Sequence, residues 1–507
     1  MHMRRRYQLK RVRHIPAHHS EHVSVVGPAD AIAELNQLAS REVNLLRQAG
    51  IRHLEPEQTG VAPPIYAYGD DNTWQPQTIA SQVDTELSIQ VYGCALQPNV
   101  TLPDAIDKLK SALADRGEEF LKKITLCLDP TLDSPYESSD SPYESSDSPY
   151  ESSDSPYESS DSPYESSDSP YESSDSPMVV DPSVTSNSLA GQPALERVGF
   201  NWLRNMRPDL TGAGVTVLIL DTLPVQGGAD VAHEYIDFWM DWVGDQPLPA
   251  GPPDTAPQPP IIPAAEIHRY HGILVASLVR HMAPSSTIVA ARVLDDQGKG
   301  WSTTIIQAIL WALGHRKNKT TINGQRLIHD RLIFNMSMGL PRTQAEEAEA
   351  VCLLHTMDVA ARAATLTVCA AGNDSQRKPE NPVEPAAFGY FADTPATGAQ
   401  VIATAGTNRL TEYAFFSNEG HIAAPCRHII GDTGPDSQIR QKYGFSTVRW
   451  SGTSFATPQI SGLAALLWST ERVPFYQIKQ HIWRTAHLPR RWDGVREIDF
   501  VRAFRAI

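Results

Sequence analysis

Cysteine is scarce in this chain. Its 507 residues include five cysteines, at positions 94, 127, 352, 369 and 426. They are widely spaced and none lies in a Cys-x-x-Cys pair, so the pattern indicates neither a disulfide framework nor a cysteine-based metal site. We therefore expect reduced thiols in the core, as is usual for buried cysteines.

Long apolar runs are missing as well. No segment approaches the roughly 20 apolar residues that a membrane-spanning helix needs. The basic start, MHMRRRYQLKRVRH, is not followed by the apolar stretch of a secretory signal peptide. We interpret it as a short solvated tail rather than a nucleic-acid-binding element. The expectation is a cytoplasmic protein without a transmembrane segment, with non-classical export left open.

The acidity of the chain has a local origin. The formal net charge is −16, but six tandem copies of SPYESSD, from Ser134 to Asp175, carry −12 of it. A proline in every copy stops a helix, and one tyrosine per seven residues is too little for a coiled coil. The composition predicts a disordered acidic linker over residues 133–177, with a phospho-acceptor or docking tract as the alternative.

The two flanks of this linker differ in pattern. Residues 1–132 mix helical spacing, over Asp30–Ala49 and Leu102–Ile124, with a strand-like alternation over Asp84–Leu96. They predict a small α+β domain. In residues 178–507, apolar segments of strand length alternate with helical ones, which predicts an α/β domain whose mostly parallel sheet has helices on both faces.

Polar residues follow three of the strand-like segments in the larger region. Asp221 follows VTVLIL, Ser337 follows LIFNM and Asn373 follows a small-residue run ending in AAG. The carboxyl ends of parallel strands lie along one edge of a sheet, where sites form. We therefore expect these three residues to lie near one another.

Two further candidates stand where helices are expected to begin. His271 opens the segment HGILVASL, and Ser454 lies in SGTSFATP before a long apolar helix. Pro458 is expected in the first turn of that helix. The free N–H groups of such a helix start stabilise negative charge, which suits a serine that attacks a carbonyl.

Together these residue types fit nucleophilic catalysis. Ser454 needs a base to remove its proton, His271 has the side chain suited to that near neutral pH, and Asp221 would orient the imidazole. Taken singly, each is more simply a turn, cap or core residue. His268 and His271 could instead share a metal, but no third ligand with suitable spacing is evident, so we predict no metal site.

The order Asp221, His271, Ser454 and the motifs around these residues resemble the subtilisin-like serine proteases (subtilases, peptidase S8 type). The resemblance covers roughly residues 190–490. It implies a subtilisin-like fold, serine endopeptidase activity on polypeptides and an oxyanion hole that uses Asn373. It implies no required cofactor, with a structural calcium ion left open. The residues that it implies for substrate binding are Gly298, Gly300, Trp301, Ser337, Met338 and Gly339.

Some positions depart from the family pattern. Leu223 stands where a glycine is usual, and Ile273 falls in a divergent histidine motif. Two alternatives to hydrolysis stay open: a catalytically impaired pseudo-protease that binds peptides, and a ligase or cyclase that uses the same three residues. Residues 1–132 are expected to be either a removable propeptide or a partner-binding module.

Overall fold

The structure is a computed structural model that describes residues 22–133 and 178–507 with gaps. The gaps are residues 42, 57–61, 70, 78–87, 99, 101, 115–123, 129–130, 181, 185–187, 225–230, 244–263, 297, 339–350, 374–399, 410 and 489–495. The predicted linker, apart from Asp133, lies outside the described residues.

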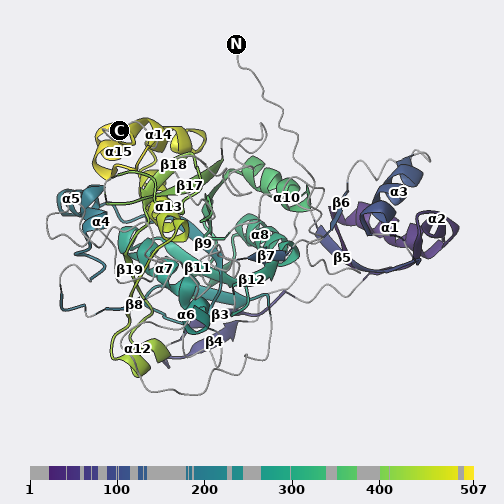
Figure 1. Cartoon of the computed structure of the whole chain (residues 1–507), viewed down its shortest axis with the longest axis horizontal. Coiled ribbons are helices and arrows are strands. Elements are labelled where there is room, and N and C mark those ends of the chain that lie inside the picture. The colour runs from purple at the N-terminus through teal and green to yellow at the C-terminus, as the bar shows by residue number, and fades with distance from the viewer. Residues whose placement is uncertain are drawn as a thin grey trace, which may run out of the picture.

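A nine-stranded sheet forms the centre of the larger region (Figure 1). Its first seven strands are parallel, and an antiparallel hairpin completes it. The strands, in spatial order, are β18 (Ile422–Pro425), β17 (Val401–Thr407), β16 (Thr365–Ala370), β15 (Arg331–Met336), β9 (Val215–Asp221), β11 (Thr287–Arg292), β10 (Phe238–Asp241), β3 (Ile65–Tyr68) and β4 (Trp74–Gln77).

Helices cover both faces of this sheet, which agrees with the expected α/β class. The side chains of a strand alternate between its two faces. In β9, Val217 and Ile219 join the core under helices α7 (His271–Met282) and α13 (Thr453–Ser469). Leu218 joins the core on the other side. That second core includes residues of α8 (Ser302–Lys317) and α10 (Val351–Arg362).

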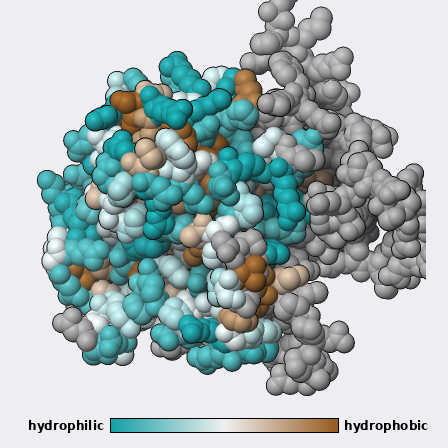
Figure 2. All heavy atoms as spheres, turned by 90° about the vertical axis from the view of Figure 1, so that its left-hand side faces the viewer, coloured by the Kyte–Doolittle hydropathy of each residue, from teal (hydrophilic) through white to brown (hydrophobic). Residues whose placement is uncertain are grey.

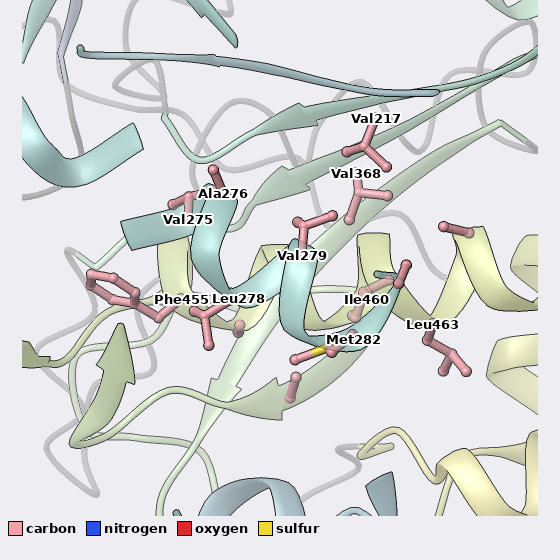
Figure 3. Close-up of a cluster of buried hydrophobic side chains, with 14 of the residues drawn as sticks. Val217, Val275, Ala276, Leu278, Val279, Met282, Val368, Phe455, Ile460 and Leu463 are labelled. Carbon is pink, nitrogen blue, oxygen red and sulfur yellow. The ribbon is translucent and has the colours of Figure 1, made fainter. Parts of the chain in front are cut away.

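Figure 3 shows how the two helices of the first face meet the sheet. Leu278 of α7 lies beside Phe455 of α13, Met282 of α7 lies near Ile460 and Leu463 of α13, and Val217 of β9 belongs to the same cluster. All of these side chains are fully buried. The starts of α7 and α13 are thereby fixed relative to the carboxyl end of the sheet.

A second, four-stranded antiparallel sheet lies in the N-terminal region (Figure 1). The order is β2 (Ile51–Pro56), β5 (Ser88–Leu96), β1 (His22–Gly27) and β6 (Thr125–Leu128). Its helices are α1 (Ala29–Arg41), α2 (Val43–Gln48) and α3 (Leu102–Ala114). The helix expected over Asp30–Ala49 corresponds to α1 and α2, on either side of residue 42, which is not described. The helix expected over Leu102–Ile124 is described as far as Ala114, and residues 115–123 lie outside the described residues.

The two faces of this small sheet have different neighbours. Val23 and Val25 of β1 pack into the core formed with the N-terminal helices. Val26 joins the core around α8 and α10, and the Ser24 hydroxyl lies 3.0 Å from that of Thr303 in α8. The N-terminal sheet therefore rests on two helices of the larger region.

The β3–β4 hairpin precedes the domain boundary expected at residue 132, yet it belongs to the large sheet of the region after that boundary. Although it belongs to the N-terminal part of the chain, it extends the large sheet beside β10. Tyr66 stacks on Trp239 with ring centroids 4.0 Å apart, and the Trp74 indole N–H donates to the Val231 carbonyl oxygen at 2.9 Å. The N-terminal residues thus complete a structural layer of the larger region.

Short strands and helices make up the remaining described elements. The strands are β7 (Thr131–Asp133) with β12 (Lys299–Trp301), β13 (Thr321–Ile322) with β14 (Gln325–Arg326), and β19 (Ile429–Asp432) with β20 (Thr447–Trp450) and β8 (Met178–Val179). The α-helices are α4 (Pro193–Arg197), α5 (Phe200–Met206), α6 (Ala264–Ile267), α12 (Gln438–Tyr443), α14 (Ile478–Thr485) and α15 (Phe500–Arg505), and the 3-10 helices are η4 (His268–Tyr270) and η6 (Phe475–Gln477).

The cysteines do not all have the expected state. Cys94, Cys369 and Cys426 are buried thiols, as predicted. Cys352 is disulfide-bonded, so the expectation of reduced thiols throughout is wrong for this residue. Sequence spacing did not indicate this bond because a disulfide depends on distance in space rather than along the chain.

The surface carries isolated apolar side chains. Figure 2 shows one face, on which hydrophobic spots are scattered among hydrophilic residues. The large apolar side chains exposed in the described part are Met178, Val184, Trp202, Met206, Phe445, Tyr476, Trp483 and Leu488. Among the described helices, none has the length and apolar character to cross a membrane.

The packing of α7 against α13 predicts that two leucine-to-alanine substitutions change the free energy of unfolding by different amounts. Leu463→Ala should lower the free energy of unfolding by about 2–5 kcal/mol, because it leaves a cavity at a fully buried position. Leu488→Ala, at a side chain that is 52% exposed, should change it by about 0.5 kcal/mol or less. Denaturant unfolding of both variants measures this difference. Equal losses would contradict the packing described.

Candidate active site

The carboxyl edge of the large sheet gathers the candidate residues. Asp221 is the last residue of β9, Ser337 follows β15, and Asn373 lies just beyond β16. These three strands are adjacent and parallel. His271 is the first residue of α7 and Ser454 the second of α13, so both arrive at this edge on helix N-termini.

Three of these side chains form a hydrogen-bonded row. His271 Nδ1 lies 2.8 Å from Asp221 Oδ1 and 3.0 Å from Oδ2. His271 Nε2 lies 3.0 Å from Ser454 Oγ. None of the three residues is more than 2% exposed. Positions 50 and 183 residues apart in the chain are thus brought within hydrogen-bonding distance.

The chemistry of the three groups fixes the direction of these hydrogen bonds. An ionised carboxylate only accepts, so Nδ1 of His271 carries a proton and donates to Asp221. In a neutral imidazole the other nitrogen, Nε2, then has a lone pair that accepts from the Ser454 hydroxyl. The Thr222 backbone N–H also donates to Asp221 Oδ1, at 2.7 Å, which helps to compensate for burying the carboxylate.

Aromatic rings enclose the imidazole. The ring centroids of Trp450 and Phe455 lie 5.6 Å and 5.3 Å from that of His271, and both are arranged edge to face. Trp450 also stacks on His268, at 5.6 Å. Such surroundings exclude water and strengthen the polar contacts within the row.

A glycine permits the close approach of α7 to β9. A Cβ atom on Gly272 would lie 2.3 Å from the Thr222 carbonyl oxygen and 3.0 Å from Asp221 Cβ. Real Cβ atoms essentially never come so close to a backbone oxygen. The absence of a side chain at this position therefore lets His271 reach the carboxylate.

Proline shapes the helix that carries the serine. The expectation that Pro458 lies in the first turn is wrong, because α13 begins at Thr453 and Pro458 lies in the second turn. Proline has no N–H, so it cannot make the helical hydrogen bond to the carbonyl oxygen four residues earlier, which is that of Ser454. The Ser337 hydroxyl donates to this oxygen instead, at 2.9 Å.

Ser337 is itself held by a buried polar network. The Asn335 side-chain amide donates to Ser337 Oγ at 3.0 Å, and the Ser461 hydroxyl donates to Asn335 Oδ1 at 2.8 Å. All three residues are fully buried. The network connects strand β15 to helix α13 next to the candidate nucleophile.

Asn373 is oriented by the residue that precedes the serine. Its Oδ1 accepts from the Thr453 backbone N–H at 2.9 Å and from the Thr453 hydroxyl at 3.0 Å. Because both hydrogen bonds hold the oxygen, the amide nitrogen occupies the opposite side of the group. Asn373 is thus fixed beside the start of α13, where the N–H of Ser454 also lies.

Strand β12, which contains Gly300 and Trp301 of the expected substrate-binding residues, is already paired with another strand. In β12, Gly300 lies opposite Leu132 of β7 in an antiparallel ladder. Gly298 adopts a positive φ of 80° in the turn before it. A Cβ on Gly300 would lie 2.4 Å from the Val293 carbonyl oxygen, so only glycine fits there. Trp301, which ends β12, is partly buried.

The other residues expected to bind substrate, Ser337, Met338 and Gly339, lie after strand β15. Ser337 and Met338 are both fully buried. The Ser337 hydroxyl contacts the Ser454 backbone rather than an open surface. Gly339 lies outside the described residues.

Several residues with a part in this arrangement were not singled out from the sequence. They are Thr222, Asn335, Thr453 and Ser461, which orient the candidate groups. Only Asn335 carried a usable signal, since it stands two residues before Ser337 at the end of an apolar strand. The positions of Leu223 and Ile273, which depart from the family pattern, are buried in the core.

The described residues do not favour metal binding or cysteine-based catalysis at this site. Within the described ranges, no cluster of three or more histidine, cysteine or acidic side chains has a metal-binding arrangement. Cys369 lies at the end of β16, and burial raises the pKa of its thiol to about 12. A thiol with such a pKa is not a nucleophile near neutral pH.

Comparison with known proteins places these features in a family. Residues 260–500 match the model of the subtilase family. Asp221 precedes the matched range, so its assignment depends on its contact with His271.

Individual subtilisin-like proteases are also similar to part of this chain. A subtilisin-like protease from Coccidioides posadasii is 30% identical over 209 residues, which are 40% of this chain and 44% of that protein. Subtilisin-like protease 6 from Trichophyton schoenleinii is 28% identical, over 50% of this chain and 53% of that protein. Subtilisin from Bacillus pumilus is 27% identical, over 55% of this chain and 81% of that protein.

The chain spans about half the length of the two fungal relatives. The family match, which includes His271 and Ser454, nevertheless agrees with the names of these relatives. The region of residues 260–500 is therefore subtilase-like, by the family match and by the names of the relatives.

Proposed function

We propose that the protein is a serine endopeptidase that cleaves peptide bonds through an acyl-enzyme intermediate. The observation that carries this proposal is the row of hydrogen bonds from Asp221 through His271 to Ser454. A serine, a base and an orienting carboxylate in this order are what hydroxyl activation requires.

Each group has a role in the proposed reaction. Ser454 Oγ attacks the substrate carbonyl carbon while its proton passes to His271 Nε2, and Asp221 stabilises the resulting imidazolium. The Asn373 amide and the Ser454 backbone N–H donate to the oxyanion. His271 then gives the proton to the leaving amine, and a water molecule, activated by the same imidazole, hydrolyses the ester.

Substrate would bind as an additional β-strand along β12. Backbone hydrogen bonds of this kind hold an extended peptide with little dependence on its side chains. The support for this mode is that β7 (Thr131–Asp133) already pairs with β12 in an antiparallel register. A peptide substrate would replace β7 in that position.

The same pairing suggests a role for the N-terminal region. We propose that it acts as an inhibitory propeptide rather than as a module that recruits a partner. Its four-stranded sheet rests on α8 and α10, and the chain then enters the strand position proposed for substrate. With β7 in the strand position proposed for substrate, the enzyme would be inactive until the region is removed.

Ser454→Ala should abolish peptidase activity, with a loss of about 10⁴-fold or more, because the nucleophile is missing. It should also abolish labelling by a fluorophosphonate probe. Ser469→Ala removes a hydroxyl from the other end of the same helix and should leave both unchanged. Peptide binding without labelling or turnover in the wild type would favour a pseudo-protease. Ligated products in the mass spectrum would indicate acyl transfer to an amine.

Gly272→Ala should lower kcat by about 100-fold, because the added methyl group pushes α7 away from β9 and displaces the imidazole. In an ordinary helix, alanine is more favourable than glycine by about 0.5–1 kcal/mol, so propensity alone would favour this change. Steady-state kinetics measure the effect, and a thermal melt shows whether the variant is folded. A folded variant with normal kcat would contradict the proposed constraint.

Incubation of the wild-type chain should split it within residues 134–177. This segment directly follows β7, which is paired with β12, and it precedes β8 (Met178–Val179), which is paired with β20. Intact mass spectrometry locates the cut, and Ser454→Ala serves as the uncut control. A wild-type chain that stays intact and is fully active would contradict the inhibitory role.

A further inference from the structure

Cys352 lies at the contact between the two parts of the chain. It is the second residue of α10 and is fully buried. Its Sγ is 3.8 Å from the Ser24 carbonyl oxygen in β1 and 3.4 Å from that of Thr125 in β6. The sulfur of a residue in the protease domain is thus in contact with the backbone of the N-terminal sheet.

The strand register brings a second cysteine position to the same place. Residue 127 of β6 lies directly opposite Ser24 in the antiparallel pair β1–β6. Directly opposed residues share one face of a sheet. Ser24 contacts Thr303 of α8, so this is the face that meets the protease domain.

The state of the other cysteines identifies the disulfide partner of Cys352. Cys352 is disulfide-bonded, whereas Cys94, Cys369 and Cys426 are thiols. Of the five cysteines in the chain, only Cys127 is left as a partner. We propose that Cys127 and Cys352 form a redox-sensitive disulfide that ties the N-terminal region to the protease domain and holds it there after the linker is cut.

The bond forms by a balanced exchange with a small-molecule disulfide. The two thiols lose two protons and two electrons as their sulfur–sulfur bond forms. The small-molecule disulfide gains them and is reduced to two thiols. A dithiol reductant reverses the exchange and is itself oxidised to a disulfide. Reducing compartments would open the tether, and oxidising ones would keep it closed.

The tether changes the consequence of cleavage. Without it, a cut within residues 134–177 leaves the N-terminal fragment attached only by non-covalent contacts, including the β3–β4 hairpin. With it, the fragment stays covalently bound, and β7 keeps a high effective concentration at β12. Activation would then need both a cut and a reduction. This consequence for activity depends on the inhibitory role proposed above, whereas the disulfide itself does not.

The bond is tested by counting thiols in the full chain. The protein is incubated with excess oxidised glutathione, unfolded in guanidinium and alkylated with iodoacetamide. We expect three alkyl groups before reduction and five after it, with one cross-linked peptide pair containing Cys127 and Cys352. Five alkyl groups without reduction, or glutathione adducts on these two cysteines, would overturn the proposal.

The tether is tested by limited digestion with a glutamate-specific protease, which has one target in each of the six repeats. On a denaturing gel without reductant, the cut wild type should migrate as one cross-linked species. Cys94→Ala, the control in the same sheet, should behave identically. Cys127→Ala and Cys352→Ala should each give two fragments. Two fragments from the wild type would overturn the tether.

The activity of the cut protein separates the two proposals. A dithiol should increase the activity of the cut wild type and leave that of cut Cys352→Ala unchanged. If the dithiol separates the wild-type fragments without increasing activity, the tether stands and the inhibitory role fails. If no disulfide is found, the proposed tether is wrong. The inhibitory role of the N-terminal region is then tested separately, by the self-cleavage experiment described above.

Discussion

The buried contact between a carboxylate and an imidazole is the constraint on which the site depends. The Asp221 carboxyl group is fully buried, and burying a carboxylate is costly unless hydrogen bonds compensate for the lost water. His271 and the Thr222 backbone N–H supply them. This contact requires α7 to begin almost against the end of β9, which Gly272 allows. The position of α13 follows, because α13 packs along α7.

Much of this arrangement could be predicted from local patterns. Parallel strands end at one edge of a sheet, so apolar segments followed by Asp221, Ser337 and Asn373 indicated a shared location. The sequence also predicted that helices begin at His271 and near Ser454, because apolar residues at helical spacing follow both positions. The position of Pro458 was misjudged because a hydroxyl from another strand takes over the hydrogen bond that proline cannot make. That partner is distant in sequence, so no local pattern indicated it.

Features that join distant segments could not be predicted in this way. The β3–β4 hairpin is short, and nothing in its alternation tells which sheet it joins. The bond at Cys352 depends on the docking of one sheet against α10, which the spacing of cysteines does not encode. The hydrogen bond from the Ser337 hydroxyl to the Ser454 carbonyl oxygen was not indicated for the same reason. The contact of Ser337 with substrate, which the family resemblance implies, stays a prediction.

The hairpin has a consequence for the protease once it is alone. If the N-terminal residues leave, β10 loses its neighbour and becomes the outermost strand, with unpaired backbone groups facing solvent. The flat side of Trp239, now covered by Tyr66, would be uncovered as well. Open strand edges of this kind invite pairing with other chains. The released protease would therefore expose the edge of β10, which would pair with another polypeptide or with a second copy of the protease.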